Sequence, residues 1–343
     1  MTIRICGDEV MTFDDVLIIK NGKNQRAVEN PDGKYPIYGS GGIMGYADDY
    51  ICEADTVIVG RKGSINNPIF VEEPFWNVDT AFGLVAKREV LLPRYLYYFC
   101  RNYDFERLNK AVTIPSLTKS DLLKIEITLP SLEIQEKIVN KLLKIEEVIQ
   151  ARQQQLQKMD ELVKARFVEL FGDPVLNQHG WRKVALEVNA TLLNGRAYKQ
   201  DELLDSGKYP VLRVGNFFSN RGWYYSDLEL DDDKYCDNGD LLYAWSASFG
   251  PQIWNGGKVI YHYHIWKVLV GEAYNKQFLC KLLEYATESL MGDTHGIAMM
   301  HLTKSGMEKT EFIVPPIEQQ EQFAAFVEQT DKSKLCGKMG VAA

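Results

Sequence analysis

Two loops near the start of the chain carry residues suited to contact with an anionic polymer. Tyr38-Gly39-Ser40-Gly41-Gly42 is followed by Gly60-Arg61-Lys62-Gly63-Ser64. Glycine permits close backbone approach, serine supplies a short hydrogen-bonding arm, and arginine or lysine reaches phosphate or guanine. The pattern predicts a nucleic-acid contact. Its candidate residues are Tyr38, Gly39, Ser40, Gly41, Arg61, Lys62 and Ser64.

A second pair of polar loops follows about 180 residues later. Leu212-Arg213-Val214-Gly215-Asn216 precedes Ala244-Trp245-Ser246-Ala247-Ser248-Phe249-Gly250. In a single module we would slightly favour ordinary β-turns for such segments. Two modules with matching positions but different loops instead indicate two different recognition sites. The candidates here are Arg213, Asn216, Asn220, Arg221, Trp245, Ser246 and Ser248.

Three other constellations resemble catalytic or metal motifs, and we interpret each as structural. Asn67-Pro68-Ile69-Phe70 lacks the second proline of an adenine-gripping methyltransferase box, and no glycine-rich methyl-donor turn accompanies it. His262 and His264 share one face of an expected strand, but a zinc site needs three or four ligands. Pro31-Asp32-Gly33-Lys34 has no partner acid for a nuclease site. No phosphate-binding loop or nucleophile elbow is present, so we predict no catalytic and no metal residues.

The loops belong to an internal repeat. Leu117-Thr118-Lys119-Ser120 returns 185 positions later as Leu302-Thr303-Lys304-Ser305. At the same offset Pro130, Glu133, Gln135 and Glu136 recur, and Asn21-Gly22 returns as Asn194-Gly195 at a slightly shorter one. So long a period is typical of tandem modules, not of short stacked repeats.

Each module begins with strands and turns and ends in a helix. Val57-Ile58-Val59 and Ala81–Val85 read as strands, and Pro93–Asn102 reads as a helix with proline in its first turn. From Ser131, apolar residues recur at heptad spacing until Phe171-Gly172-Asp173-Pro174 ends the helix. The seam contains Ile138, Leu142, Ile145, Ile149, Leu156, Met159, Val163 and Leu170.

Composition limits the class of protein. The chain of 343 residues is 45% hydrophobic and 25% charged, which is ordinary for a globular protein of two or three domains. It has no apolar run of membrane-spanning length and no apolar leader, and its six cysteines are scattered, so we expect a soluble cytoplasmic protein with reduced thiols. The net charge of −8 opposes DNA binding unless basic residues cluster or a partner supplies phosphate contacts.

The combined motifs resemble the specificity subunit of type I restriction–modification enzymes. The resemblance covers about residues 10–335 and rests on five segments: Tyr35–Gly42, Gly60–Ser64, Leu117–Ser120, Leu129–Ile138 and Phe171–Pro174. It implies an α+β fold with two target-recognition domains joined by long coiled-coil spacer helices, the second shortened. We place the first recognition domain at 1–130, the first spacer helix at 131–174, the second recognition domain at 175–315, the truncated helix at 316–335 and an irregular tail at 336–343.

The resemblance also implies partners and a division of labour. Each recognition domain reads one half of a bipartite double-stranded DNA target, and the spacer helices dock two methyltransferase subunits. Restriction subunits complete an ATP-dependent nuclease. S-adenosylmethionine, ATP and Mg²⁺ then bind in those partners, and this non-catalytic chain needs no cofactor. The expected coiled-coil and docking residues are Ile138, Leu142, Ile145, Ile149, Leu156, Met159, Val163, Phe323 and Val327.

The second helix departs from the repeat, because its expected end lies beyond Ala343. Two explanations stay open: a naturally short helix or an altered reading frame. If residues 317–335 run antiparallel to 152–170, the seam from Ile138 to Ile149 lacks an intramolecular partner. We then expect self-association, or a methyltransferase subunit that covers the seam. The alternative of a different class is a non-DNA scaffold whose aromatic modules bind protein or sugar.

Overall fold

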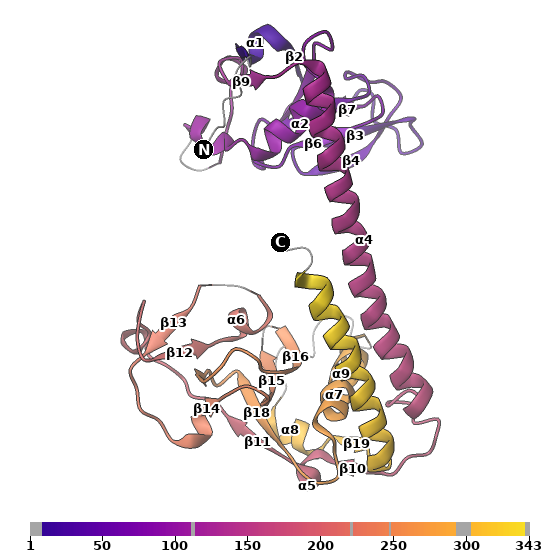
Figure 1. The fold of residues 1–343 in the computed structure, drawn as a ribbon, viewed down its shortest axis with the longest axis vertical. Coiled ribbons are helices and arrows are strands. Elements are labelled where there is room, and N and C mark those ends of the chain that lie inside the picture. The colour runs from indigo at the N-terminus through magenta and orange to yellow at the C-terminus, as the bar shows by residue number, and fades with distance from the viewer. Residues whose placement is uncertain (1–8, 111–113, 220–221, 247, 293–302, 340–343) are drawn as a thin grey trace. The chain divides into compact units, whose positions relative to one another are not determined.

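The computed structural model describes residues 9–339 except 111–113, 220–221, 247 and 293–302. The chain divides into two compact units, Met1–Gln150 and Ala151–Ala343. Figure 1 shows each unit as a mixed α/β body. The division falls inside one long helix, α4 (Leu132–Phe171), which therefore contributes to both units.

The first unit contains two small sheets, of strand order β2-β8-β5-β6 and β4-β3-β7, and a separate pair, β1-β9. Its strands are β1 (Glu9–Thr12), β2 (Leu17–Asn21), β3 (Tyr35–Gly39), β4 (Gly42–Ala47), β5 (Thr56–Gly60), β6 (Ile69–Val71), β7 (Trp76–Asn77), β8 (Ala81–Ala86) and β9 (Glu126–Leu129). Its helices besides α4 are α1 (Phe13–Val16), α2 (Pro93–Asn102), the 3-10 helix η1 (Phe105–Leu108) and α3 (Lys119–Leu122).

The second unit contains sheets of order β11-β18-β15-β16 and β13-β12-β17-β14, and the pair β10-β19. Its strands are β10 (Lys183–Ala185), β11 (Ala190–Asn194), β12 (Tyr209–Leu212), β13 (Tyr224–Ser226), β14 (Tyr235–Cys236), β15 (Leu241–Ser246), β16 (Ser248–Ile253), β17 (Val259–Tyr261), β18 (Ile265–Val270) and β19 (Glu311–Ile313). Its helices are α5 (Leu186–Asn189), η2 (Gln200–Glu202), α6 (Val214–Phe218), η3 (Asp232–Lys234), α7 (Lys276–Gly292), α8 (Lys304–Lys309) and α9 (Ile317–Met339).

The two units share one strand order. In each, a four-stranded antiparallel sheet accompanies a sheet that contains a parallel pair, β3 with β7 or β12 with β17. This other sheet has three strands in the first unit and four in the second, where β14 is added. The pairs β1-β9 and β10-β19 join the start of each module to the strand before its long helix. The internal repeat of the sequence is therefore a repeat of topology.

The Asn-Gly dipeptides mark a shared close contact. A Cβ placed on Gly22 would lie 1.8 Å from the Val78 carbonyl oxygen, and one on Gly195 would lie 2.4 Å from the Tyr261 and His262 carbonyl oxygens. Only glycine lets the two chain segments come so close. The contact holds the loop after β7 or β17 against the end of the first sheet strand.

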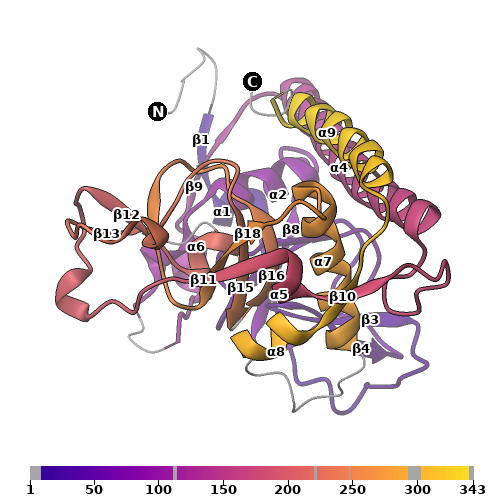
Figure 2. The same ribbon diagram turned by 90° about the horizontal axis from the view of Figure 1, so that it is seen from below.

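Aromatic and aliphatic side chains fill one main core in each unit. In the first, Phe13 and Leu96 are buried against the four-stranded sheet with other apolar residues of β2, β5 and β8. In the second, Phe278 and Leu282 of α7 join Phe167, Phe171 and the strands β11, β15 and β18. The helix α7 lies between the sheet and α9, which agrees with Figure 2.

A buried glutamine fastens the start of each long helix. Gln135 Nε2 donates to Val90 O at 2.8 Å and Pro130 O at 2.9 Å, and its Oε1 accepts from Leu92 N at 2.9 Å. Gln320, 185 positions later, makes the same three bonds, to Ala273 O, Pro315 O and Asn275 N, at 2.8–3.0 Å. Both side chains are fully buried. The helix start and the loop before α2 or α7 are thus locked together.

The last part of α4 runs antiparallel to α9. Phe323 packs edge-on against Phe167 and Phe171, and Lys334 forms an ion pair with Asp160 at 2.7 Å. The two helices lie side by side in Figures 1 and 2. These contacts confirm the expected pairing of 317–335 with 152–170. The buried residues of α4 here are Val163, Phe167 and Phe171, so Phe167, absent from the predicted heptad seam, has a central place in the packing.

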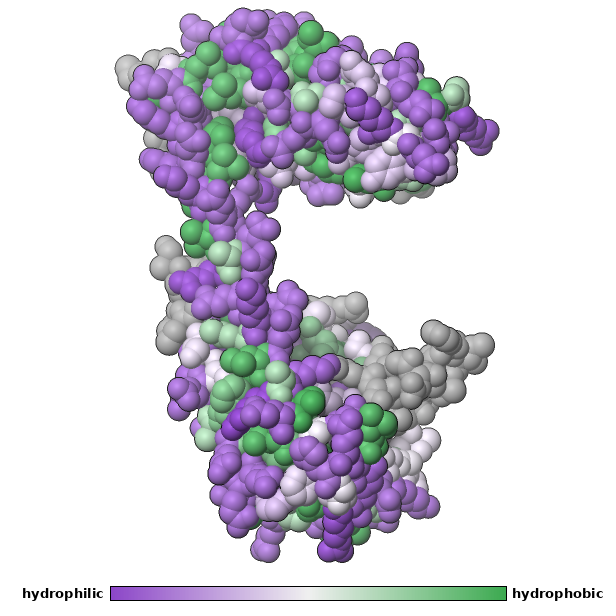
Figure 3. All heavy atoms as spheres, turned by 90° about the vertical axis from the view of Figure 1, so that its right-hand side faces the viewer, coloured by the Kyte–Doolittle hydropathy of each residue, from purple (hydrophilic) through white to green (hydrophobic). Residues whose placement is uncertain are grey.

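Two features of the helices differ from the sequence prediction. The irregular tail predicted for 336–343 is wrong for 336–339, because α9 continues to Met339. In the first unit, Ile138 and Leu142, which were expected to be exposed, are half-buried, whereas Ile145 and Ile149 are exposed as expected, Ile145 by 54%. Val148 between them is 55% exposed. Figure 3 shows apolar areas interrupting the hydrophilic surface of this long helix.

The predicted end of α4 is confirmed. Gly172 follows the last helical residue, Phe171, at φ +73°, and its N–H donates to the Val168 carbonyl at 2.8 Å. A left-handed residue that closes the last turn in this way is a typical glycine C-cap. Trp181 Nε1 donates to the Phe171 carbonyl at 2.9 Å and satisfies another helix-end acceptor.

Candidate nucleic-acid interface

In the first unit, three loops meet at the end of β3 and β5. A Cβ placed on Gly60 would lie 3.0 Å from the Ser40 Cβ and 2.3 Å from the Ser64 carbonyl oxygen. The turn of Ser40 and Gly41 therefore touches the loop 60–64. Gly63 N donates to Pro115 O at 3.1 Å, which brings in the segment before Leu117. Tyr38 and Gly39 are the last residues of β3 and lead into this site.

Arg61 is exposed, yet its guanidinium is held in place. Its Cζ lies 5.8 Å from the centroid of the Phe82 ring, and Nη1 donates to Asp79 O at 3.4 Å. The backbone holds the residue as well, because Arg61 N donates to Thr80 O at 2.7 Å. The planar guanidinium of Arg61 therefore lies over the buried ring of Phe82 in β8, while the loop that carries Arg61 is exposed.

The neighbouring candidates share this exposure. Lys62 and Ser64 are both exposed, and the backbone of Lys62 forms an isolated antiparallel β-bridge with Ser116. The Tyr38 ring packs edge-on against Phe75 at 5.5 Å, and burial raises the pKa of its phenol. Tyr38 therefore stays neutral and positions the turn, while Ser40, Lys62 and Ser64 present polar groups from the loops.

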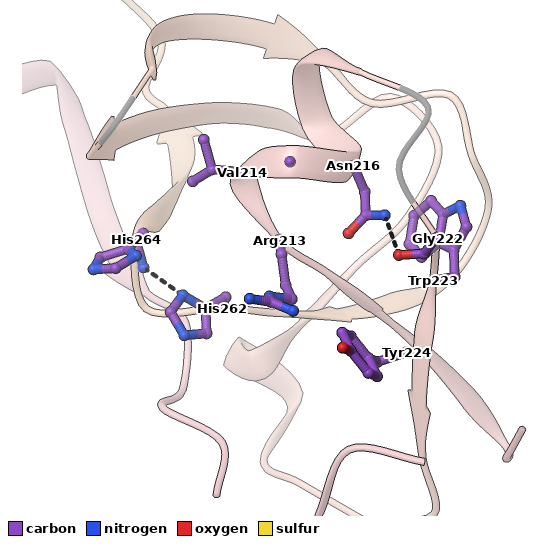
Figure 4. A pocket seen from close by; sticks show the side chains of 9 residues that line it. Arg213, Val214, Asn216, Gly222, Trp223, Tyr224, His262 and His264 are labelled. Atoms are coloured by element: carbon purple, nitrogen blue, oxygen red, sulfur yellow. Dashed lines mark hydrogen bonds between the residues drawn. The ribbon is translucent and has the colours of Figure 1, made fainter. Parts of the chain in front are cut away.

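In the second unit, a short helix replaces the turn. Arg213 is the N-cap residue of α6, and with Asn216 it lines a cavity of about 550 Å³. Figure 4 shows the Arg213 side chain between His262 and Tyr224, while Asn216 points toward Gly222. The Arg213 Cζ lies 5.2 Å from the centroid of the Tyr224 ring, and Asn216 Nδ2 donates to Gly222 O at 3.1 Å. The cavity offers one cation, one amide and aromatic faces.

The two histidines lie in the turn between β17 and β18, so the prediction that they share a strand face is wrong. Their rings are 4.7 Å apart, and His264 N donates to His262 Nδ1 at 3.4 Å. Burial, His264 and Arg213 lower the pKa of His262 to about 4. Among the residues that the structure describes, no group of three or more His, Cys, Asp or Glu side chains could hold a metal ion.

Trp245 lines a second cavity of about 530 Å³, together with residues that include Thr303 and Lys304. Its ring stacks on Trp266 at 5.7 Å and 18°, and its Nε1 donates to Tyr263 O at 2.8 Å. Ser246 and Ser248 pair across the tip of the β15–β16 hairpin, where Ser246 is half-buried and Ser248 is exposed. The tip lies beside Trp245, so the structure brings these three candidates together.

Some candidates lie outside this picture, and some contributors were missed. Asn220 and Arg221 lie outside the described residues. Tyr224, which contacts Arg213, is not among the predicted residues. The same holds for the loop residues Asp79 and Tyr263, whose carbonyls accept from Arg61 and Trp245. The aromatic run Trp223-Tyr224-Tyr225 could have indicated Tyr224. The Asp79 and Tyr263 carbonyls could not have been found, because every residue has a backbone carbonyl and the sequence does not mark which ones accept a bond.

The four cysteines whose side chains the structure describes show no sign of a further site. Cys52, Cys100, Cys236 and Cys280 are free and buried. Burial raises the pKa of the Cys52, Cys236 and Cys280 thiols to about 12. Protonated, buried thiols are inert packing groups.

Comparison with known proteins identifies the repeated module. A family model described as the type I restriction modification DNA specificity domain matches the chain twice, at residues 7–160 and 179–336. A type I restriction enzyme specificity subunit assigned in Haemophilus influenzae is 22% identical over 336 residues, 92% of this chain and 86% of the relative. The EcoBI specificity subunit of Escherichia coli is 23% identical over 161 residues, 45% of this chain and 34% of the relative.

Solved structures share the fold. The type I restriction–modification S subunit of M. genitalium aligns with a TM-score of 0.62 at 16% identity, over 100% of this chain and 94% of that chain. A chain from a structure of complex assembly and conformational transition of the type I R-M system aligns at 0.57 and 17% identity, over 98% and 93%. Within the described residues, no helix is both long and apolar enough to span a membrane.

Proposed function

The chain belongs to the type I restriction–modification DNA specificity family, and on that premise we propose that each of its two recognition domains reads one half of a bipartite duplex. As a specificity subunit it is the non-catalytic, DNA-reading component of its system. This identity replaces the alternative of a scaffold for protein or sugar. The finer assignment of residues to half-sites comes from the geometry of the loops.

One observation carries the proposal. Two domains of corresponding strand order present different loops at equivalent strand ends, those of β3 and β5 in the first and of β12, β15 and β17 in the second. The first presents a glycine turn and a basic loop, and the second presents a short helix, a tryptophan and a histidine turn. A shared scaffold fixes the position of each loop, while the loop side chains decide which base edges they contact.

The acidic charge of the chain supports a role for partner subunits. With a net charge of −8, the chain alone neutralises few phosphates. We assign methyl transfer, DNA cleavage and the binding of S-adenosylmethionine, ATP and Mg²⁺ to methyltransferase and restriction subunits. One of the solved neighbours comes from a structure of complex assembly of the type I R-M system, which supports assembly with partner subunits. The exposed residues of α4 around Ile145 and Ile149 are candidates for methyltransferase docking.

The half-site assignment has a direct test. The complex is assembled with Arg61→Ala and Ser64→Ala in one variant and Arg213→Ala and Ser246→Ala in another. The methylated sequences are then mapped by methylome sequencing. We expect the first variant to relax one half-site and the second to relax the other, because each lost base contact costs about 1–3 kcal/mol of discrimination.

The matched control is Gln153→Ala with Gln154→Ala on an exposed part of α4, which should leave the target unchanged. If the first variant alters both half-sites, the assignment of one domain to each half is wrong. If the unmodified complex methylates no two-part sequence, the proposed function itself fails.

A second test concerns affinity. We expect the isolated chain to bind cognate duplex weakly, and binding to strengthen with the methyltransferase partner. The slope of log affinity against log salt counts phosphate contacts, so it should steepen in the complex. Titration of labelled duplex at several salt concentrations gives both quantities. Equal affinity and equal slope with and without the partner would contradict the proposal.

A further inference from the structure

Arg61 and Trp245 occupy equivalent positions in the two domains, although one is a basic residue and the other an aromatic residue. In the first domain, Val59 pairs with Phe82 and Gly60 with Ala81, and Arg61 follows. In the second, Tyr243 pairs with Trp266 and Ala244 with Ile265, and Trp245 follows. Phe82 and Trp266 each also pair with the asparagine of an Asn-Gly dipeptide, Asn21 and Asn194. The registers therefore match residue for residue.

The hydrogen bonds of this position match as well. The backbone N–H of Arg61 donates to Thr80 O at 2.7 Å, and that of Trp245 donates to His264 O at 3.0 Å. The side-chain N–H groups donate to the carbonyls one residue earlier, Asp79 for Arg61 and Tyr263 for Trp245. Each side chain covers the buried ring of the adjacent strand, Phe82 or Trp266. One framework thus holds two chemically different groups.

We propose that this shared position is a specificity-determining position in both domains, where Arg61 reads guanine in one half-site and Trp245 reads a thymine methyl group in the other. This inference rests on the proposed function. It goes beyond it by naming the base chemistry at a single equivalent position in each half.

The guanine assignment follows from the fixed orientation of Arg61. A guanidinium has five N–H donors in a planar fork, and the bond to Asp79 engages one of its terminal nitrogens. Bidentate contact with guanine N7 and O6 uses such an oriented fork, which is the commonest base-specific contact of arginine. The aromatic ring beneath and the carbonyl beside it supply this orientation. Lys62, exposed next to it, is a flexible point charge suited to phosphate.

The thymine assignment follows from the apolar surface that the Trp245 side chain presents. Indole has a single donor, Nε1, and Tyr263 O already accepts from it. One face of the ring is stacked on Trp266, so the half-buried side chain offers carbon atoms to its cavity. The apolar group that base edges present in the major groove is the thymine 5-methyl group. The cavity contains no carboxylate among its lining residues, all of which the structure describes.

The test uses base analogues on the complete complex. Its target is first selected from a random duplex library. Replacement of guanine by 7-deazaguanine in the first half removes the N7 acceptor, and we expect about a fivefold to tenfold loss of affinity at one position. Replacement of thymine by deoxyuridine in the second half removes one methyl group, and we expect about a fourfold loss at one position.

The variants assign these losses to residues. Arg61→Ala should abolish sensitivity to 7-deazaguanine and leave the deoxyuridine effect intact, while Trp245→Ala should do the reverse. Trp245→Arg should make the second half sensitive to 7-deazaguanine at the same position. As a matched control, Lys62→Ala should weaken all sequences equally and keep both analogue effects. Thermal unfolding of each variant shows whether it remains folded.

Several results would overturn the proposal. Arg61→Ala that weakens every sequence equally would make Arg61 a phosphate ligand. Indifference of the unmodified complex to deoxyuridine throughout the second half excludes the thymine contact, even if Trp245 variants do not fold. A library that yields no two-part target at all would instead refute the proposed function.

Discussion

The buried amides of Gln135 and Gln320 place single side chains at the junction of helix and domain. Each satisfies two carbonyls and one N–H that the surrounding protein shields from water. A buried polar group without a partner costs about 1–3 kcal/mol, so the loss of one amide affects several groups at once.

We expect Gln135→Ala to lower the free energy of unfolding of the first unit by about 2–4 kcal/mol, because three backbone groups lose their partner. Gln320→Ala should have a similar effect on the second. Urea unfolding measures both. The control Gln153→Ala, on an exposed face of α4, should change it by less than about 0.5 kcal/mol. An equal effect of the control and Gln135→Ala would show that the amide bonds contribute nothing.

His262 gives the second unit a pH dependence. Its pKa is lowered to about 4 by burial and by His264 and Arg213, whereas the unfolded chain titrates near 6.5. Between these values the unfolded state binds the extra proton, so the free energy of unfolding should fall as pH drops from about 6.5 to 4. Denaturation at a series of pH values, compared with His262→Asn, isolates this contribution. A parallel pH profile of the variant would contradict it.

Residue roles were only partly predictable from the sequence. The repeat marked Gln135 and Gln320 as special, but two of the three partners of each lie in a loop some 45 residues away. Arg61 and Trp245 were both predicted, in loops at matching places of the two modules, but not as equivalent residues, because their equivalence is a matter of strand register and not of residue type. Long-range pairing is what a local pattern does not contain.

Helices and strands with strong local signals were predicted well. Pro93–Asn102 is α2 with proline at its first position, and β5, β8 and the end of α4 lie where the pattern indicated them. The histidine segment was misread as a strand, because alternation of aromatic residues does not show that a turn interrupts it. The last turns of α9 lack a heptad pattern but continue a helix that Phe323 and Val327 already anchor in the core.

Close contact between elements should make the Asn-Gly dipeptide intolerant of substitution. Gly22→Ala would bring a methyl group to 1.8 Å from the Val78 carbonyl oxygen, which forces the backbone apart. We expect the free energy of unfolding to fall by about 1–3 kcal/mol. Gly41→Ala is the matched control, since a Cβ there meets no atom within 4 Å. Equal stability of the two variants in urea unfolding would argue against a tight junction.

At the scale of the whole molecule, the exposed residues Ile145, Val148 and Ile149 form a seam on α4. Contiguous apolar surface of this kind on a helix usually has a partner. We propose that this partner is a second copy of the chain or a methyltransferase subunit.

We expect the isolated chain to self-associate through this seam, and Ile145→Glu with Ile149→Glu to yield a folded monomer, since exposed charge opposes apolar contact. Light scattering at rising concentration measures the mass, and circular dichroism the helix content. Gln153→Glu with Gln154→Glu adds the same charge to an exposed polar part of the helix and should leave the mass unchanged. A wild-type monomer at high micromolar concentration would show that the seam does not drive self-association.

At the position shared by Arg61 and Trp245, the side chain donates to a main-chain carbonyl and lies against an aromatic ring, Phe82 or Trp266. Each of these rings is buried in the core of its own domain. Arg61 and Trp245 both donate a side-chain N–H to the equivalent carbonyl, so this position accepts residues of different chemistry. If the position reads a base as proposed, a substitution there changes the base preference of one domain while the surrounding framework stays the same.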